Sequence, residues 1–153
     1  MIKFDDLKPA GTPTYRLRGE LAAEISLSII GNELMIYNDE NFGLPISILE
    51  DQIKSGGLFR SQIEDCLILT NTDHSKDYFK YCITLKKQGK MATVNMQYYG
   101  MSLLGWEKDK AEKRRDTFSG TIMNLVKGNN EVGYAAENEY YDMLEMLFRE
   151  VFQ

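Results

Sequence analysis

The fold is decided by residues 77 to 100, which read DYFKYCITLKKQGKMATVNMQYYG. Each half alternates apolar and polar side chains, the pattern of strands with one buried face. Gln88-Gly89 between the halves is typical of a two-residue hairpin loop. The predicted register pairs apolar or aromatic residues throughout: Leu85 with Ala92, Ile83 with Val94, Tyr81 with Met96, and Phe79 with Tyr98. The other face, which holds Cys82 and Thr84, is predicted to tolerate solvent.

A second hairpin is predicted nearer the start of the chain. Leu21 to Ile30 alternates apolar with small or polar residues, and Gly31-Asn32 is a two-residue turn signal. Glu33 to Asn38 then forms the return strand. In this register Ile29 faces Leu34 and Leu27 faces Ile36, so the apolar faces of both strands coincide.

The segment between the hairpins is predicted to hold a short helix near 48–55 and a buried strand. Ser47 and Glu50 have capping-box spacing, and Lys54 to Gly57 supplies a helix stop. Cys66 to Thr70 is apolar and strand-like. Farther along, Asp116 to Lys127 has strand-like composition with a spacing that also fits a helix, and we expect a strand there.

Asn138 to Phe152 is the clearest helix in the sequence. Its polar positions form one row, in which Glu145 and Arg149 are spaced for an exposed ion pair. Apolar residues fill well over half of the circumference. A helix lying on one sheet needs less apolar surface than this, so the helix is expected either to enter a concave sheet or to meet a second chain.

These elements predict an α+β fold, mainly an antiparallel bent sheet or partial barrel with a C-terminal amphipathic helix. Pleckstrin-homology-like domains have the same general order, a likeness of layout that no residue motif carries. Residues 1–153 contain no linker or internal repeat, so one domain is expected, with a loosely ordered segment at 1–14.

Charge and composition restrict the possible partners. The net charge is −5, with 23 acidic and 18 basic residues, and the mixed-sign run from Glu107 to Asp116 offers no unopposed basic surface. We therefore expect no nucleic-acid binding and no attraction to anionic membranes. The first residues lack the apolar core of a signal peptide, and no apolar run approaches the length of a bilayer span. A cytoplasmic protein is expected.

No catalytic motif is visible, and no catalytic residue, metal or cofactor is predicted. The single histidine, His74, lies in a stretch that begins like a calcium loop, but Lys76 and Cys82 occupy its two most demanding positions. One histidine and two cysteines form no zinc site of ordinary spacing. Cys66 and Cys82 are expected to be reduced thiols in apolar strands.

The leading functional hypothesis is a non-catalytic binding module that acts through protein contacts, possible self-association included. The helix and the tyrosines outside the apolar strand faces supply its predicted binding residues: Tyr78, Tyr99, Tyr140, Tyr141, Leu144 and Phe148. Tyr78 and Tyr99 equally fit cross-strand pairing. One alternative is a carrier of small apolar ligands, with Tyr81, Tyr98 and Met96 lining a partly open barrel. A third is an enzyme whose carboxylate site is assembled by the fold.

Overall fold

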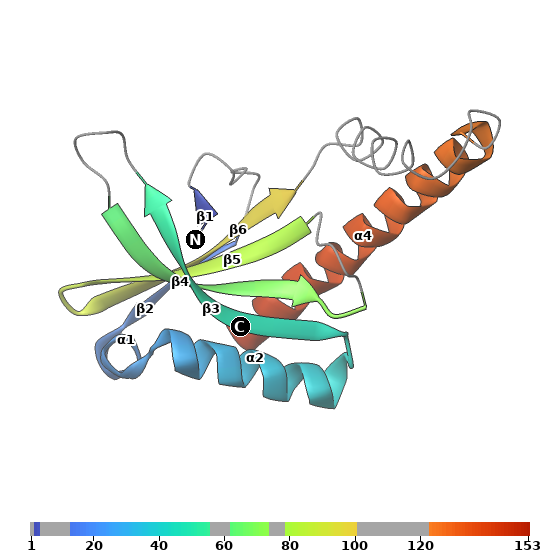
Figure 1. The fold of residues 1–153 in the computed structure, drawn as a ribbon. Helices are drawn as coiled ribbons and strands as arrows, with labels where there is room; N and C mark the ends of the chain where they lie inside the picture. Colours follow the sequence, from blue (N-terminus) through green and yellow to red (C-terminus); the bar gives the residue numbers. More distant parts are fainter. Residues whose placement is uncertain (1, 4–12, 56–61, 74–78, 101–122) are drawn as a thin grey trace. The chain divides into compact units, whose positions relative to one another are not determined.

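The chain forms a sheet accompanied by helices, shown in Figure 1. A computed structural model describes residues 2–3, 13–55, 62–73, 79–100 and 123–153, with side chains described for 13–54, 62–73, 81–97, 135–136 and 138–153. The elements in chain order are β1 (Ile2–Lys3), β2 (Thr14–Arg18), α1 (Gly19–Glu24), α2 (Leu27–Asn41), β3 (Ile46–Ser55), β4 (Gln62–Asn71), β5 (Phe79–Gln88), β6 (Met91–Gly100) and α4 (Met123–Val151).

The sheet confirms the α+β class and its antiparallel character. Its strand order is β1-β3-β4-β5-β6-β2. The strands from β3 to β6 form a meander, and β2 adds to the β6 edge in antiparallel pairing. β1 joins β3 in parallel through two residues. The fold is therefore an open five-stranded antiparallel sheet with a short parallel addition at one edge.

The hairpin of residues 77–100 is confirmed, but its register is offset by two residues. The structure pairs Leu85 with Val94, Ile83 with Met96, Tyr81 with Tyr98 and Phe79 with Gly100. The loop is Gly89-Lys90, one residue later than predicted, because Gly89 has a φ of 60°. A positive φ at the first loop position alone is the type II′ pattern, which favours glycine there. An offset of two leaves every side chain on its predicted face.

The face predicted to tolerate solvent is covered at its centre. Cys82 and Thr84 are buried, as are Cys66 and Ile68 on β4 and Ile53 on β3. Alternation along the paired strands places these five side chains on one face, opposite Ile83 and Leu67. The prediction was wrong at Cys82 and Thr84 because both faces of the central strands are buried, and alternation within one hairpin does not reveal what covers its second face.

The hairpin predicted for Leu21 to Asn38 is wrong, since these residues belong to α1 and α2. Ser26 begins α2 as its N-cap, with its hydroxyl accepting a hydrogen bond from the Ile29 N–H at 3.2 Å. Gly31 has no positive φ, so it is not a turn residue. Over the longer window, Leu27, Ile30, Leu34 and Asn38 recur at helical spacing, and the apparent alternation spans only the junction between two helices.

α2 packs against the sheet through its Ile30 and Leu34 side, both fully buried. A Cβ at Gly31 would lie 3.5 Å from Leu67 Cδ1 and 3.7 Å from Ile48 Cγ2, in ordinary van der Waals contact. Ile48 and Leu67 share the sheet face opposite Cys66, so α2 covers that face of β3 and β4. Gly31 thus lies at the helix-sheet interface, with room for one methyl group.

Gly31→Ala is expected to raise the free energy of unfolding by about 0.5–1 kcal/mol. Alanine favours the helix more than glycine does, and the added methyl meets only contacts of normal length. Urea denaturation of both proteins measures the change. A hairpin turn at Gly31-Asn32 predicts the opposite sign, because alanine is strained at positive φ. Destabilisation would therefore contradict the helical assignment.

The short helix predicted near 48–55 is also wrong, because Ile46–Ser55 form β3. All ten of its residues pair with β4, from Ile46 opposite Asn71 to Ser55 opposite Gln62. Ile46 and Ile53 are buried. The capping-box spacing of Ser47 and Glu50 is a short local pattern, and ten residues of ladder pairing outweigh it.

The C-terminal helix is confirmed and is longer than predicted. α4 begins at Met123, so the strand expected at Asp116 to Lys127 is wrong from Met123 onward, and its earlier part lies outside the described residues. The predicted ion pair is present, with Arg149 Nη2 at 2.7 Å from Glu145 Oε1. The chain divides into two compact units, Met1–Gly100 with Glu145–Gln153, and Met101–Leu144. The single domain over 1–153 stays a prediction, and the segment predicted at 1–14 lies mostly outside the described residues.

The end of α4 belongs to the unit that contains the sheet. Phe148 is fully buried, and its ring lies 5.6 Å from that of Tyr15 and 4.9 Å from that of Phe152. Tyr15 and Phe152 stack at 5.3 Å. Aromatic pairs at these separations add to the energy of burial. This three-ring cluster fixes the last turns of α4 against β2.

A hydrogen bond joins α2 to the same end of α4. The Tyr37 hydroxyl donates to Glu150 Oε2 at 3.0 Å. This hydrogen bond, burial and the negative charge of Glu150 raise the pKa of Tyr37. The hydroxyl therefore stays protonated and donating throughout the neutral pH range, which holds α2 beside Glu150.

Candidate functional site

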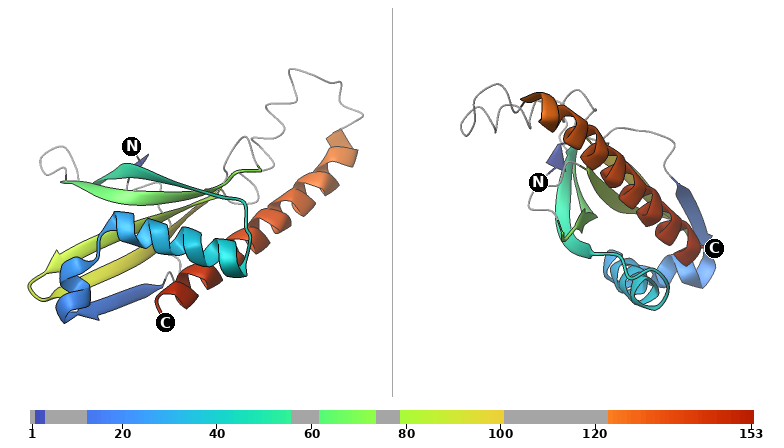
Figure 2. Two further views of the ribbon diagram at one scale, coloured as in Figure 1. Left: turned by 90° about the horizontal axis from the view of Figure 1, so that it is seen from below. Right: turned by 90° about the vertical axis from the view of Figure 1, so that its right-hand side faces the viewer.

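An apolar groove of about 310 Å³ lies between β2, α1, α2 and the end of α4. Figure 2 shows the C-terminal end of α4 beside α1 and α2. We call it the apolar groove, and its lining residues are Leu17, Leu21, Ile25, Ile29, Ile30, Glu33, Val151, Phe152 and Gln153. Seven of these nine residues carry aliphatic or aromatic side chains. Phe152 also belongs to the three-ring cluster, so one wall of the groove is fixed by core packing.

The groove opens onto large apolar side chains that solvent reaches. Leu21 is 67% exposed and Ile29 is 45% exposed. On α2, Ile29, Glu33, Ile36 and Glu40 follow one another at intervals of four, three and four residues, so they form one row. All four are exposed, whereas Ile30 and Leu34 on the adjoining side of α2 are buried. Ile29 and Glu33 line the groove, and Ile36 and Glu40 continue the row along α2 beyond it.

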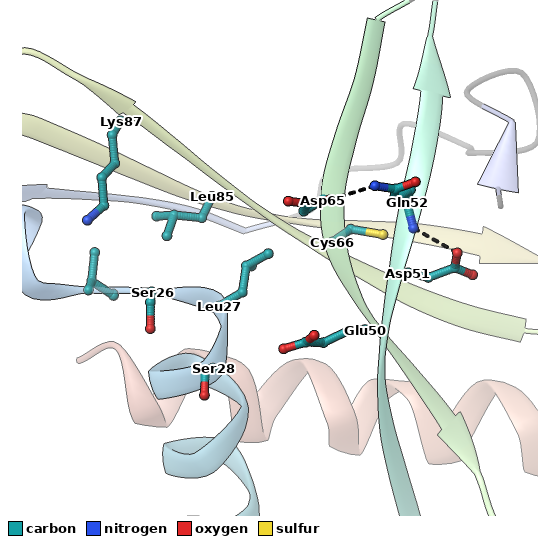
Figure 3. Close-up of a pocket in the computed structure, with 11 residues that line it drawn as sticks. Ser26, Leu27, Ser28, Glu50, Asp51, Gln52, Asp65, Cys66, Leu85 and Lys87 are labelled. Carbon is teal, nitrogen blue, oxygen red and sulfur yellow. Dashed lines mark hydrogen bonds between the residues drawn. The ribbon is translucent and has the colours of Figure 1, made fainter.

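A larger and more polar hollow, of about 570 Å³, lies on another part of the same unit. We call it the polar hollow, and Figure 3 shows the side chains that line it. Its lining residues are Ile25, Ser26, Leu27, Ser28, Glu50, Asp51, Gln52, Asp65, Cys66, Leu85 and Lys87. Three carboxylates and one ammonium give it a negative balance.

Hydrogen bonds within the protein engage several polar groups of the hollow. Gln52 Nε2 donates to Asp65 Oδ1 at 3.0 Å, and the Gln52 N–H donates to Asp51 Oδ1 at 2.7 Å, as Figure 3 shows. Lys87 Nζ donates to the Ala23 carbonyl at 2.8 Å. These contacts brace β3 against β4 and β5 against α1. The lining contains no histidine to act as a base near neutral pH.

The thiols of Cys66 and Cys82 are free, buried neighbours on adjacent strands. Cys66 is opposite Thr84 and Cys82 is opposite Ile68, which makes the two cysteines diagonal partners on one face. The hydrogen bond between them and burial raise the pKa of the Cys82 thiol. A protonated, buried thiol is a poor nucleophile, so Cys82 acts as core packing.

The described residues contain neither a cluster of metal ligands nor a membrane-spanning helix. No group of three or more histidine, cysteine, aspartate or glutamate side chains in this part of the chain is arranged to hold a metal ion. Of the described helices, none combines the length and the apolar character that crossing a bilayer requires. The calcium-like stretch around His74 lies largely outside the described residues.

Comparison with known proteins adds no relative. No family model, curated protein or solved structure matches the chain.

The predicted binding residues fall into two groups. Tyr140, Tyr141, Leu144 and Phe148 on α4 are buried, and the rings of Tyr140 and Tyr141 meet edge to face at 5.1 Å. Tyr78 lies outside the described residues, and Tyr99 is opposite Lys80 in the hairpin with its side chain not described. Their role in binding stays a prediction. The exposed apolar side chains that adjoin a groove lie instead on α1 and α2.

The sequence interpretation missed Leu21, Ile29 and Ile36 as surface residues. It placed Leu21 and Ile29 on the buried face of a strand, because local alternation was taken as a period of two. A helical reading of Leu27 to Asn41 separates Ile30 and Leu34 from Ile29 and Ile36. The helical periodicity of this segment could have identified them as surface residues. No sequence pattern indicates that β2 and the end of α4 meet at the groove.

Proposed function

We propose that this chain is a non-catalytic binding module that acts through protein contacts, and that the apolar groove is its contact surface. The observation that carries the proposal is the exposure of Leu21 and Ile29 at the mouth of a preformed groove. Adjoining exposed apolar side chains on a folded domain are typical of interaction sites.

The shape of the groove supports a peptide segment as the bound element. An amphipathic helix is commonly bound by laying its apolar side chains into a groove of this kind. Leu17 on β2, Ile25 between α1 and α2, and Val151 on α4 offer aliphatic contacts, and Phe152 offers an aromatic one. A wall held by core packing needs little ordering on binding, which favours affinity.

The alternative functions gain less from the described residues. Tyr81 and Met96 are buried and line neither the apolar groove nor the polar hollow, so these two cavities give the ligand-carrier hypothesis no support. The bent or partial-barrel form of the sheet and the pleckstrin-homology-like layout stay predictions. The oligomeric form of the hypothesis stays a prediction as well.

The test is affinity selection of peptides on the full chain. A random library of roughly 16-residue peptides, enough for about four helical turns, is selected against the immobilised protein. Selected peptides are expected to bind Leu21→Gln/Ile29→Gln about 10- to 100-fold more weakly, because two apolar side chains leave the contact. Glutamine is a good helix former, so the variant keeps α1 and α2.

The matched control is Leu49→Gln/Ile63→Gln. These residues are also large and exposed, at 59% and 57%, but they lie on β3 and β4 away from the groove lining. The control is expected to bind like the unaltered chain. If no peptide is enriched, or if both double variants lose binding equally, the groove is not the contact surface.

A further inference from the structure

We infer that the groove takes a basic amphipathic helix of another protein, with apolar residues on one side and lysine or arginine on the flanks. This inference rests on the proposed function and specifies the partner's chemistry. It is carried by the charge around the groove, which has a single sign along α1 and α2.

Residues 19 to 42, which hold both helices, contain five acidic residues and no lysine, arginine or histidine. The five are Glu20, Glu24, Glu33, Asp39 and Glu40, and all are exposed. Glu33 lines the groove itself. On α2, Glu33 and Glu40 alternate with Ile29 and Ile36 in the exposed row, so apolar and acidic contacts follow each other along one line.

The lining of the groove itself contains an acidic residue, Glu33, and no lysine or arginine. On β2, Arg16 and Arg18 alternate with Leu17, so they project from the face opposite the groove. Lys87 lines the polar hollow and not the groove, with its Nζ donating to the Ala23 carbonyl, and Arg149 is paired with Glu145. The acidic residues beside the groove therefore attract cationic side chains of a partner.

The geometry of the row sets the pattern of the partner. From Ile29 to Glu40 it extends about 16 Å, roughly three helical turns. A partner helix of similar length presents apolar residues at intervals of three and four, and its flanking cations reach Glu33 and Glu40. Rim charges of this kind mainly set the association rate and the choice of partner, whereas the apolar contacts set the residence time.

A second copy of the chain is a poorer occupant of the same surface. A symmetric contact between two grooves would bring two sets of five acidic residues together without intervening cations. Like charges at a contact oppose association. The same repulsion acts against an acidic peptide.

The test uses three synthetic helical peptides that share one leucine stripe and differ only in their flanking residues, which are lysine, glutamine or glutamate. Binding to the full chain is measured by fluorescence anisotropy at low salt. The lysine peptide is expected to bind at least about tenfold more tightly than the glutamine peptide, and the glutamate peptide to bind most weakly. The advantage is expected to shrink as salt is raised.

Reversing the charge of two residues on α2 tests whether they cause the preference for the lysine peptide. Glu33→Lys/Glu40→Lys is expected to reverse the order, so that the glutamate peptide binds more tightly than the lysine peptide. The control Glu50→Lys/Asp73→Lys makes the same change in net charge at exposed residues outside the groove lining, and it is expected to keep the original order. A basic peptide with its leucines scrambled reports attraction by charge alone.

Each contrary result has a distinct meaning. If the lysine and glutamine peptides bind equally through Leu21 and Ile29, the inferred charge preference is wrong while the proposed function stands. Equal binding of the scrambled basic peptide, or equal effects of the two charge reversals, also overturns the inference. If light scattering shows a dimer that Glu33→Lys/Glu40→Lys disrupts, the occupant is a second copy. Failure of every peptide, in this panel and in the selection, removes both proposals.

Discussion

Phe148→Ala is expected to lower the free energy of unfolding by about 3–5 kcal/mol, a large part of the total stability of a typical domain. The ring is fully buried and contacts both Tyr15 and Phe152. Its removal leaves a cavity between β2 and the end of α4, and it withdraws the support of Phe152 in the groove wall. Urea denaturation followed by circular dichroism measures the loss.

Met146→Ala is the matched control for this prediction. Met146 lies two residues earlier on the same helix and is 52% exposed. Its replacement is expected to change stability by less than about 0.5 kcal/mol, as is usual for surface substitutions. If the two variants lose similar stability, the end of α4 does not pack against β2 as the three-ring cluster requires.

Asn38→Ala is the second large expected effect, about 2–4 kcal/mol of lost stability. The Asn38 side chain is buried and holds both backbone groups of Leu44, with Nδ2 donating to the carbonyl and Oδ1 accepting from the N–H, each at 3.0 Å. Without the amide, two backbone groups at the turn into β3 lose their partners. Hydrogen exchange at the Leu44 amide is expected to accelerate at the same time.

Two further variants separate the hydrogen bonds of Asn38 from its volume. Asn38→Leu fills the volume of the asparagine, with a somewhat larger side chain, but makes neither bond, so it is expected to be as damaging as alanine. Asn41→Ala removes an exposed amide that donates to the Tyr37 carbonyl. It is expected to cost less than about 0.5 kcal/mol. A well-tolerated Asn38→Leu would contradict the structural role given to these bonds.

The sequence contained the information for the elements whose signals are local. In the hairpin of residues 79–100, alternation and a glycine turn agree over more than twenty residues, so the strands and their faces were predictable. The register was not, because Gln88-Gly89 and Gly89-Lys90 are both acceptable loops and only the φ of Gly89 separates them. The C-terminal helix was predictable for the same reason, from a sustained amphipathic pattern.

The elements that were predicted wrongly are determined by contacts between residues distant in sequence. β3 follows from pairing with β4 along its whole length, which outweighs a capping box. α1 and α2 meet at Ile25-Ser26, and their junction imitates strand alternation for a few residues. The groove combines residues near 17–33 with residues 151–153, so no local pattern marks it. Its acidic border was visible in the sequence, but a helix was needed to place Glu33 and Glu40 in one row.

The central claim is that the chain binds a partner segment in the groove formed by β2, α1, α2 and the end of α4. Backbone amide NMR of the full chain, titrated with a selected peptide, tests it most directly. The account predicts saturable shifts concentrated at Leu17, Leu21, Ile29, Val151 and Phe152, with little change at Leu49 and Ile63. Shifts centred on β3 and β4, with the groove amides unmoved, would contradict it.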